Sequence, residues 1–254
     1  MARSAQRLLG TKGPAGPVIV GLETGGETLG VSLWRLPEAV GDPVDSWRLL
    51  DDRRSHRGHR HASSVLGWLD GMLDDHALER SDIALVACGR GPGGFTGVRV
   101  GMATALGLAT GLQRPVWPVD SLAALAMAAG PQEGLVVPLI DARRGEVYGA
   151  AYRVTSGELP EQITEHRVAP VAEIVTEIRE ATSGDVPLVM LGSGALLHGV
   201  ASSLPADRHV PSAGMVALLA GSQWESSGRD ADSAPPFDPA YVRPSDAEME
   251  AGSS

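Results

Sequence analysis

The chain has 254 residues, and 43% of them are apolar, which is enough to build the core of one large globular domain or of two moderate ones. Its formal net charge is -10, with 31 acidic against 21 basic residues, so a broad nucleic-acid-binding surface of its own is not expected. Among the basic residues only Lys12 is a lysine, which leaves Schiff-base and P-loop chemistry without a candidate lysine.

The first half of the chain opens with a predicted hairpin. Residues 1–16 are basic but lack the apolar stretch of a signal peptide, and we interpret them as a flexible leader. The run PVIVGLE then predicts a strand, TGGET a turn and LGVSLWRL a second strand, with Glu23 and Thr24 where the turn begins. A polar loop, DDRRSHRGHRH, separates this hairpin from a predicted helix at 62–74.

The next predicted strand, IALVACG, carries the single cysteine, Cys88. A lone cysteine forms no disulfide within its chain, which suits the reducing cytoplasm. The nearest candidate for a membrane helix, residues 100–113, is shorter than the roughly 18 apolar residues that such a helix needs. We therefore expect a cytoplasmic protein without membrane association.

The segment GRGPGG, at 89–94, fits G-x-G-x-x-G between that strand and a predicted helix at 95–112, and it has two interpretations. As a dinucleotide fingerprint, its glycines would cradle a phosphate, although Pro92 removes one N–H from the cradle. Alternatively, the glycines allow close packing, because small residues recur every fourth position along the helix, at Gly97, Gly101, Ala105 and Ala109. A helix that is apolar nearly all round lies inside its own domain or packs on two surfaces, one of them a partner.

The second half repeats the plan of the first. After the strand PVWPVD and the helix SLAALAMAAG, the runs GLVVPLID, ARRGE and VYGAAYRV predict a second hairpin, with Asp141 in the place of Glu23. An amphipathic helix (VAEIVTEIREA), a strand (VPLVMLG) and another helix (SAGMVALLAGSQW) follow, and the tail is rich in Pro, Asp and Ser. The repeated hairpin favours a duplicated α/β architecture of the ribonuclease-H-like, actin type over a single doubly wound sheet. We place its two lobes at residues 17–130 and 131–243, with an acidic tail at 244–254.

The tip of the second hairpin, DARRGEVY, is the most polar strand end in the chain. Asp141, Arg143, Arg144 and Glu146 could face the cleft between the lobes, where two arginines could bind a phosphate or a partner's carboxylate. They could equally form salt bridges at an exposed hairpin tip. An H-x-x-H-x-H run at 56–61 has a spacing that could bind a metal, but a solvated loop is the better interpretation.

Several segments together resemble the TsaB (YeaZ) family, whose members are subunits of the bacterial machinery that makes threonylcarbamoyladenosine in tRNA. The specific ones are GRGPGGFTGVRVGMATALGLATG and DARRGEVYGAAY, and weaker matches such as VIVGLETGGETLGVSL, PVWPVDSLAALA and PAYVRP occur in the family's order. The resemblance implies an actin-like (ASKHA) two-lobed fold related to TsaD, the catalytic paralogue. In such a fold Gly192 and Gly194 would form a tight turn that borders a nucleotide pocket.

The resemblance also implies that this chain is a scaffold and not a catalyst. In TsaD an H-x-x-x-H pair binds the catalytic metal, and here Ser121 and Leu125 stand at those positions. We therefore expect no catalytic residue, metal or cofactor in this chain, with ATP and a metal ion held by partner subunits. The implied partners are a TsaD-type catalytic subunit in a heterodimer, a TsaE-type ATPase, tRNA through the complex, and a second copy of the chain when it is alone.

In this family the helices at 62–74 and 95–112 would dock on the matching pair of helices in TsaD. We expect the contact to come from bulky and small apolar residues of these helices: Val65, Leu69, Met72, Val98, Gly101, Met102, Ala105 and Leu106.

The chain departs from the family at the first turn, where Asp-Thr-Ser-Thr is usual and ETGG stands here. The change removes hydroxyl donors and lengthens the acidic side chain, which weakens a nucleotide-phosphate role for Glu23 and Thr24. The alternative function is an independent enzyme of the actin-like superfamily, either a nucleotide-dependent phosphotransferase or a metallopeptidase.

Overall fold

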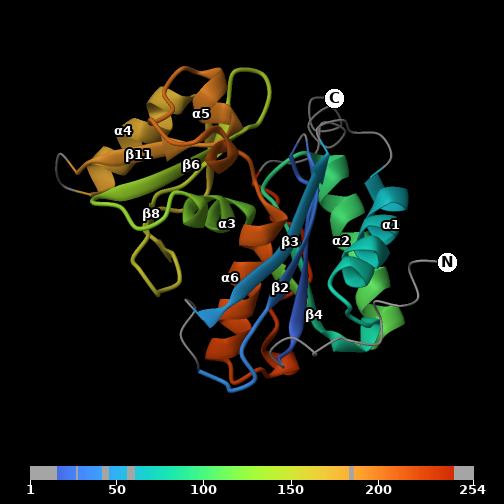
Figure 1. Ribbon diagram of the computed structural model, residues 1–254. Coiled ribbons are helices and arrows are strands. Elements are labelled where there is room, and N and C mark those ends of the chain that lie inside the picture. Colours follow the sequence, from blue (N-terminus) through green and yellow to red (C-terminus); the bar gives the residue numbers. More distant parts are fainter. Residues whose placement is uncertain (1–15, 27, 42–45, 56–60, 183–185, 243–254) are drawn as a thin grey trace.

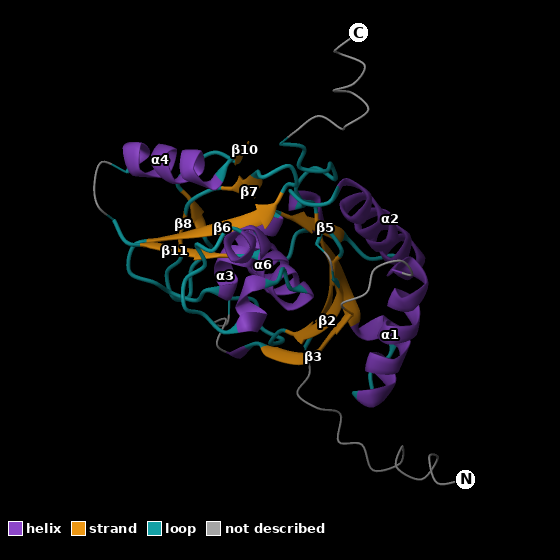
Figure 2. Cartoon of the chain, turned by 90° about the horizontal axis from the view of Figure 1, so that it is seen from above, coloured by secondary structure: helices purple, strands orange, loops and turns teal. Residues whose placement is uncertain are grey.

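The computed structural model describes residues 16–26, 28–41, 46–55, 61–182 and 186–242, without the side chains of 61–63. Two sheets lie on either side of a central helical layer (Figures 1 and 2). The first sheet has the strand order β3-β2-β1-β4-β5, in which β1 is antiparallel to β2 and parallel to β4. Its strands are β1 (Val18–Glu23), β2 (Leu29–Arg35), β3 (Arg48–Ser55), β4 (Ile83–Gly89) and β5 (Val116–Val119).

Helices cover both faces of the first sheet, because its central strand is apolar on both sides. All six residues of β1 are buried, and successive side chains alternate between the two faces. Val18, Val20 and Leu22 belong to one core cluster, and Ile19 belongs to another. The first core lies under α1 (His61–Asp75) and α2 (Phe95–Leu112), and the second lies under α3 (Ser121–Ala128) and α6 (Ala213–Ser226).

The second sheet repeats the pairing of the first. Strand β6 is antiparallel to β7 and parallel to β11, as β1 is to β2 and β4. The strand order is β10-β7-β6-β8-β9, with β11 beside β6. The elements are β6 (Leu135–Asp141), β7 (Val147–Gly149), β8 (Tyr152–Arg153), β9 (Glu161–Gln162), β10 (Arg167–Ala169), α4 (Val171–Ala181), β11 (Leu188–Leu191) and α5 (Ser193–Leu197). The predicted duplicated α/β fold is thereby confirmed.

The structure differs from the predicted elements in two places. Residues 51–55 form the last part of β3 and not a loop, because they pair with residues 29–33 of β2. Arg53 forms an ion pair with Asp51 at 2.9 Å, and Arg54 forms one with Asp52 at 2.7 Å. These ion pairs neutralise four of the five charged side chains of this edge strand. The predicted strand at 147–154 is interrupted into two short strands, β7 and β8, which pair with β6 in one continuous antiparallel register.

Helix α6 returns to the first sheet from late in the chain. It packs on β1, β2 and β4, and its other side contacts α3. Ile19 of the first sheet and Val136 of the second belong to the same core cluster as these two helices. The lobes therefore share one core, while the boundaries at 130 and 131 stay a prediction. The remaining short 3-10 helices are η3 (Arg80–Asp82), η4 (Ala206–His209) and η5 (Ala231–Ser233).

Candidate functional site

A buried carboxylate ends the first strand at the junction of the lobes. Glu23 is 2% exposed; its Oε1 accepts a hydrogen bond from the Gly25 N–H at 2.6 Å, and its Oε2 accepts one from Ser121 Oγ at 3.2 Å. Burial raises the pKa of Glu23 above its usual 4.5, the hydrogen bonds from Gly25 and Ser121 oppose that rise, and the charge of Asp120 adds to it. Both oxygens have donors within the chain, so Glu23 ties the β1–β2 turn to the start of α3.

Gly89 leaves the space that this carboxylate occupies. A Cβ at Gly89 would lie 2.2 Å from Glu23 Oε2 and 2.8 Å from Ser121 Oγ. Ser121 Oγ also accepts a hydrogen bond from the Gly91 N–H at 3.3 Å. The first glycine of the G-x-G-x-x-G segment therefore serves close approach of a side chain.

The rest of the glycine turn is packed against the β1–β2 turn. The Gly94 N–H, at the start of α2, donates to the carbonyl oxygen of Gly25 at 2.7 Å, and Thr24 Oγ1 donates to the carbonyl oxygen of Gly97 at 2.7 Å. A Cβ at Gly97 would lie 2.2 Å from the Thr24 carbonyl oxygen, and one at Gly101 would lie 1.9 Å from Thr24 Oγ1. The Gly94 N–H is thus bonded within the chain, and the small ridge of α2 faces inward against Thr24.

The expected partner-binding residues lie mostly on that inner face. Only Leu106 reaches the surface, and the other seven are buried between the helices and the sheet: Val65, Leu69, Met72, Val98, Gly101, Met102 and Ala105. An all-apolar helix does not reveal in its sequence which side its own sheet covers. The structure corrects the orientation, since six of these side chains belong to the core of the lobe and Gly101 is buried beside them.

Helices α1 and α2 lie at the outside of the molecule (Figure 2), and other residues of the same helices form their outer surface. Leu66 is 54% exposed and Leu106 is 45% exposed. A Cβ at Gly67 or Gly107 would meet no atom within 4 Å. We call this surface, which includes the exposed Ala103, the α1–α2 face. It is apolar, and within the described residues no element covers it.

Helix α2 also passes the length and composition test for a membrane-spanning helix, with a mean hydropathy of 1.2 over its 18 residues. It differs from a membrane span in this structure because one side packs on the first sheet. Only five of its 18 residues are buried, so its own core does not account for its apolar character.

The tip of the second hairpin folds back on Asp141. The Arg143 N–H donates to Asp141 Oδ1 at 2.9 Å, and the Arg143 guanidinium lies 3.5 Å from Asp141 Oδ2. Arg143 and Arg144 have positive φ angles of 65° and 55°, and the Ala142 N–H closes the turn on the Glu146 carbonyl oxygen at 2.9 Å. This tip is exposed, unlike the buried tip at Glu23.

Two glycines make the tight turn between β11 and α5. Gly192 has a φ of 108°, and a Cβ there would lie 2.3 Å from the Leu139 carbonyl oxygen. A Cβ at Gly194 would lie 2.6 Å from Val147 Cγ1. Ser193, between them, accepts a hydrogen bond from the Asp141 N–H at 3.1 Å, which brings this turn beside the second hairpin. The turn therefore lies beside Asp141, and a nucleotide pocket bordered by Gly192 and Gly194 stays a prediction.

Three polar side chains that the sequence did not single out as a group meet between the lobes. His166 Nε2 lies 3.0 Å from Asp120 Oδ2 and 2.9 Å from the Tyr152 hydroxyl, which also donates to Asp120 Oδ1 at 3.3 Å. Burial, followed by the charge of Asp120, raises the pKa of Tyr152. Asp120 also caps α3 through the Ala123 N–H at 2.7 Å. No motif links these residues, since they come from three separate segments.

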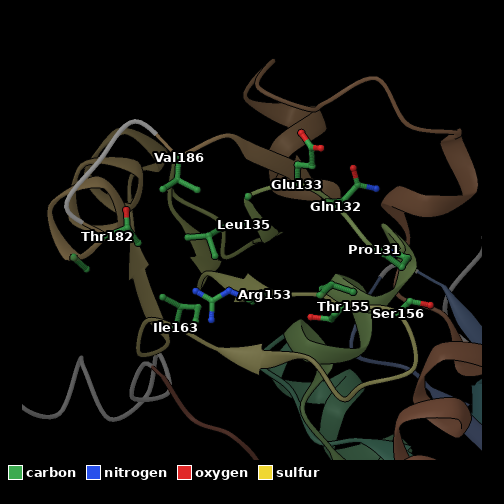
Figure 3. A pocket seen from close by; sticks show the side chains of 13 residues that line it. Pro131, Gln132, Glu133, Leu135, Arg153, Thr155, Ser156, Ile163, Thr182 and Val186 are labelled. Atoms are coloured by element: carbon green, nitrogen blue, oxygen red, sulfur yellow. The ribbon is translucent and has the colours of Figure 1, made fainter.

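A cavity of about 680 Å³ is lined by residues other than these (Figure 3). It opens beside Leu135, at the first end of β6, whereas Asp141 ends that strand. Six polar side chains line it, and one of them, Arg153, pairs with Glu161 outside the lining: Gln132, Glu133, Arg153, Thr155, Ser156 and Thr182. None of the predicted site residues lines this cavity.

The described residues contain no group of three or more His, Cys, Asp or Glu side chains arranged to hold a metal. His56 and His59 of the H-x-x-H-x-H run lie outside the described residues. Ser121 and Leu125 are both buried, Ser121 against Glu23 and Leu125 in the core shared by the lobes.

Comparisons with known proteins agree with this geometry. Residues 55–189 match the family model described as "TsaD: tRNA N6-adenosine threonylcarbamoyltransferase". The tRNA threonylcarbamoyladenosine biosynthesis protein TsaB of Escherichia coli is 35% identical over 179 residues, which cover 69% of this chain and 71% of the relative. The protein of the same name in Bacillus subtilis is 29% identical over 180 residues, covering 71% of this chain and 72% of the relative.

Solved structures show the same likeness. YeaZ from Pseudomonas aeruginosa has a TM-score of 0.65 at 27% identity, covering 89% of this chain and 99% of that one. A second Pseudomonas aeruginosa structure, described as similar to the peptidase YEAZ, has a TM-score of 0.66 at 28% identity, covering 89% of this chain and 100% of that one.

Proposed function

The chain belongs to the TsaB (YeaZ) family, and from that premise we propose that it is a non-catalytic subunit in the synthesis of threonylcarbamoyladenosine in tRNA. It acts as a scaffold and activator for a TsaD-type subunit, which transfers the threonylcarbamoyl group to N6 of adenosine 37. The names of its relatives support the pathway, since they place the TsaB proteins in this biosynthesis.

The observation that carries the pairing with a TsaD-type subunit is the uncovered α1–α2 face. Leu66 and Leu106 are large, apolar and about half exposed, and Gly67 and Gly107 leave open space beside them. Glycine in the middle of a helix costs about 0.5–1 kcal/mol relative to alanine, and packing within the chain does not explain these two. A second helix pair can approach closely there, and an exposed apolar patch of this kind is typical of a protein interface.

The division of labour follows from the residues at the end of β1 and the start of α3. Glu23 and the glycine turn are hydrogen bonded within the chain, and Ser121 and Leu125 offer no useful metal ligands. The metal ion and the ATP are then bound by the partner subunits, a TsaD-type subunit and a TsaE-type ATPase. With a net charge of -10, this chain contacts tRNA through the complex. In the absence of its partner, the same face pairs two copies of the chain.

The test is formation of threonylcarbamoyladenosine in a reconstituted mixture of the TsaD-type and TsaE-type subunits, a threonylcarbamoyl-AMP donor system, ATP and tRNA. We expect product only when this chain is present, and no turnover by the chain alone. Product formation that is equally fast without the chain would contradict the proposal, and turnover by the chain alone would favour an independent enzyme.

A further inference from the structure

An aromatic and cationic cluster lies at the first turn of α2, at the edge of the α1–α2 face. The Arg99 guanidinium carbon lies 3.7 Å from the centroid of the Phe95 ring, and Arg99 Nε donates to the Tyr241 hydroxyl at 2.7 Å. The Phe95 and Tyr241 ring centroids are 5.8 Å apart. All three side chains are exposed, so the cluster belongs to the surface and not to the core.

The end of the described chain holds Tyr241 in this position. The Ala240 N–H donates to the carbonyl oxygen of Arg90, just after β4, at 2.8 Å. Phe237, four residues before Tyr241, packs against the core beneath α1 and α2. Tyr241 is therefore fixed beside α2 by contacts on the same segment, and the Arg99 side chain has a defined orientation before any partner binds.

Arg99 is the single charged residue of α2. Within the residues that the structure describes, it lies within ion-pair distance of no carboxylate, whereas Arg229 pairs with Glu225 of α6 at 2.6 Å. Stacking on Phe95 and the hydrogen bond from Nε to the Tyr241 hydroxyl orient the planar guanidinium group. Its two terminal nitrogens form the edge that binds carboxylates in a bidentate way.

We propose that Arg99 is the charged anchor of the α1–α2 face and binds a carboxylate of the docked protein subunit. This inference rests on the proposed function and specifies what the partner must present: an Asp or Glu side chain beside an apolar patch. Phe95 and Tyr241 lower the entropic cost of binding because they hold the arginine in place beforehand. The carboxylate supplies the charge complementarity that fixes the register of the two helix pairs.

The surroundings favour a protein carboxylate over an RNA phosphate. RNA and DNA binding depends on several cations along one surface. Along the α1–α2 face, Arg99 is followed by Ala103, Leu106 and Gly107, and α1 adds Leu66, with Asp70 beside it in an ion pair with Arg80 at 2.8 Å. One arginine without an ion pair in the described part of the chain, beside apolar residues and a neutralised pair, fits the rim of a protein interface.

The experiment compares the affinity of the full chain and its variants for the TsaD-type subunit at two salt concentrations. We expect Arg99→Gln to weaken binding about tenfold at low salt and to make the remaining affinity less sensitive to salt. Arg99→Lys keeps the charge but lacks the planar group, so it recovers only part of the affinity. Arg114→Gln is the matched control, since Arg114 is exposed directly after α2 and bonds the Ser81 carbonyl oxygen; we expect it to bind like the original chain.

Each outcome separates this inference from the proposed function. If Leu106→Arg abolishes binding while Arg99→Gln binds normally, the α1–α2 face is the docking surface but Arg99 is not its charged anchor. If Arg99→Gln leaves the affinity for the subunit unchanged but weakens tRNA binding by the complex, Arg99 contacts RNA and the inference is overturned. Equal losses in Arg99→Gln and Arg114→Gln would also overturn it, because they would indicate a general effect of charge.

Discussion

Helices α2 and α6 cover opposite faces of the same sheet, have similar apolar compositions and differ in what covers them. Each has one charged residue, but eight of the 14 residues of α6 are buried against five of the 18 residues of α2. The outward side of α6 packs on α3, in the core shared with the second sheet. The outward side of α2 has no such cover within the described residues (Figure 1).

The comparison teaches that apolar composition alone does not distinguish a core helix from a docking helix. What distinguishes them is whether the chain itself covers the side of the helix that faces away from the sheet. The second lobe covers that side of α6, and we propose that another subunit covers that side of α2. The inner and outer sides of α2 should then respond to substitution in opposite ways.

The largest expected effect comes from charging the inner side of α2. Met102 is buried in the core under α1 and α2, so Met102→Arg should lower the free energy of unfolding by more than about 4 kcal/mol, because the new charge has no partner there. Urea unfolding followed by circular dichroism measures the loss. A variant that stays as stable as the original chain would mean that Met102 faces outward.

A smaller loss is expected where α2 approaches the β1–β2 turn. In Gly101→Ala the new methyl group would overlap Thr24 Oγ1, and the forced shift should lower the free energy of unfolding by about 1–3 kcal/mol. Gly107→Ala is the matched control on the outer side, where a Cβ meets nothing within 4 Å, and it should raise stability by about 0.5–1 kcal/mol. A free energy of unfolding that falls in Gly101→Ala and rises in Gly107→Ala would support the distinction between the two sides of α2. Changes of the same sign in both variants would contradict it.

Glu23, which holds the turn that α2 covers, should give a smaller and pH-dependent effect. Because its pKa is raised in the folded chain, the folded state keeps the proton to a higher pH than the unfolded state does. Its contribution to stability is therefore greatest below the usual pKa of 4.5 and declines as the pH rises through the raised value. Glu23→Gln should lack this decline when free energies of unfolding are measured from acid to neutral pH, and an unchanged pH profile would contradict the assignment.

The sequence predicted those features that depend on local patterns. The helices predicted at 95–112 and 171–181 have these same bounds in the structure, because a glycine turn precedes one and strong amphipathic periodicity marks the other. The repeated hairpin predicted the duplicated fold, since a buried strand, a polar turn and a second strand are legible in both halves.

What the sequence did not reveal depends on tertiary contacts. The sequence does not indicate which side of α2 packs on the sheet, because both sides are apolar. The grouping of Asp120, Tyr152 and His166 could not be predicted, because these residues come from separate segments that only folding brings together. The longer side chain of Glu23 suggested an altered cleft, but its bonds to Gly25 and Ser121 required the folded positions of β1 and α3.

The most direct test of the central claim is the affinity of Leu106→Arg for the TsaD-type subunit, measured beside Leu196→Arg. Both leucines are about half exposed, on α2 and α5 respectively, so neither change should unfold the chain. We predict that Leu106→Arg weakens binding by about 100-fold or more, because it places a charge in the centre of an apolar interface, while Leu196→Arg binds like the original chain. Normal binding by Leu106→Arg, with the stability unchanged, would contradict the account.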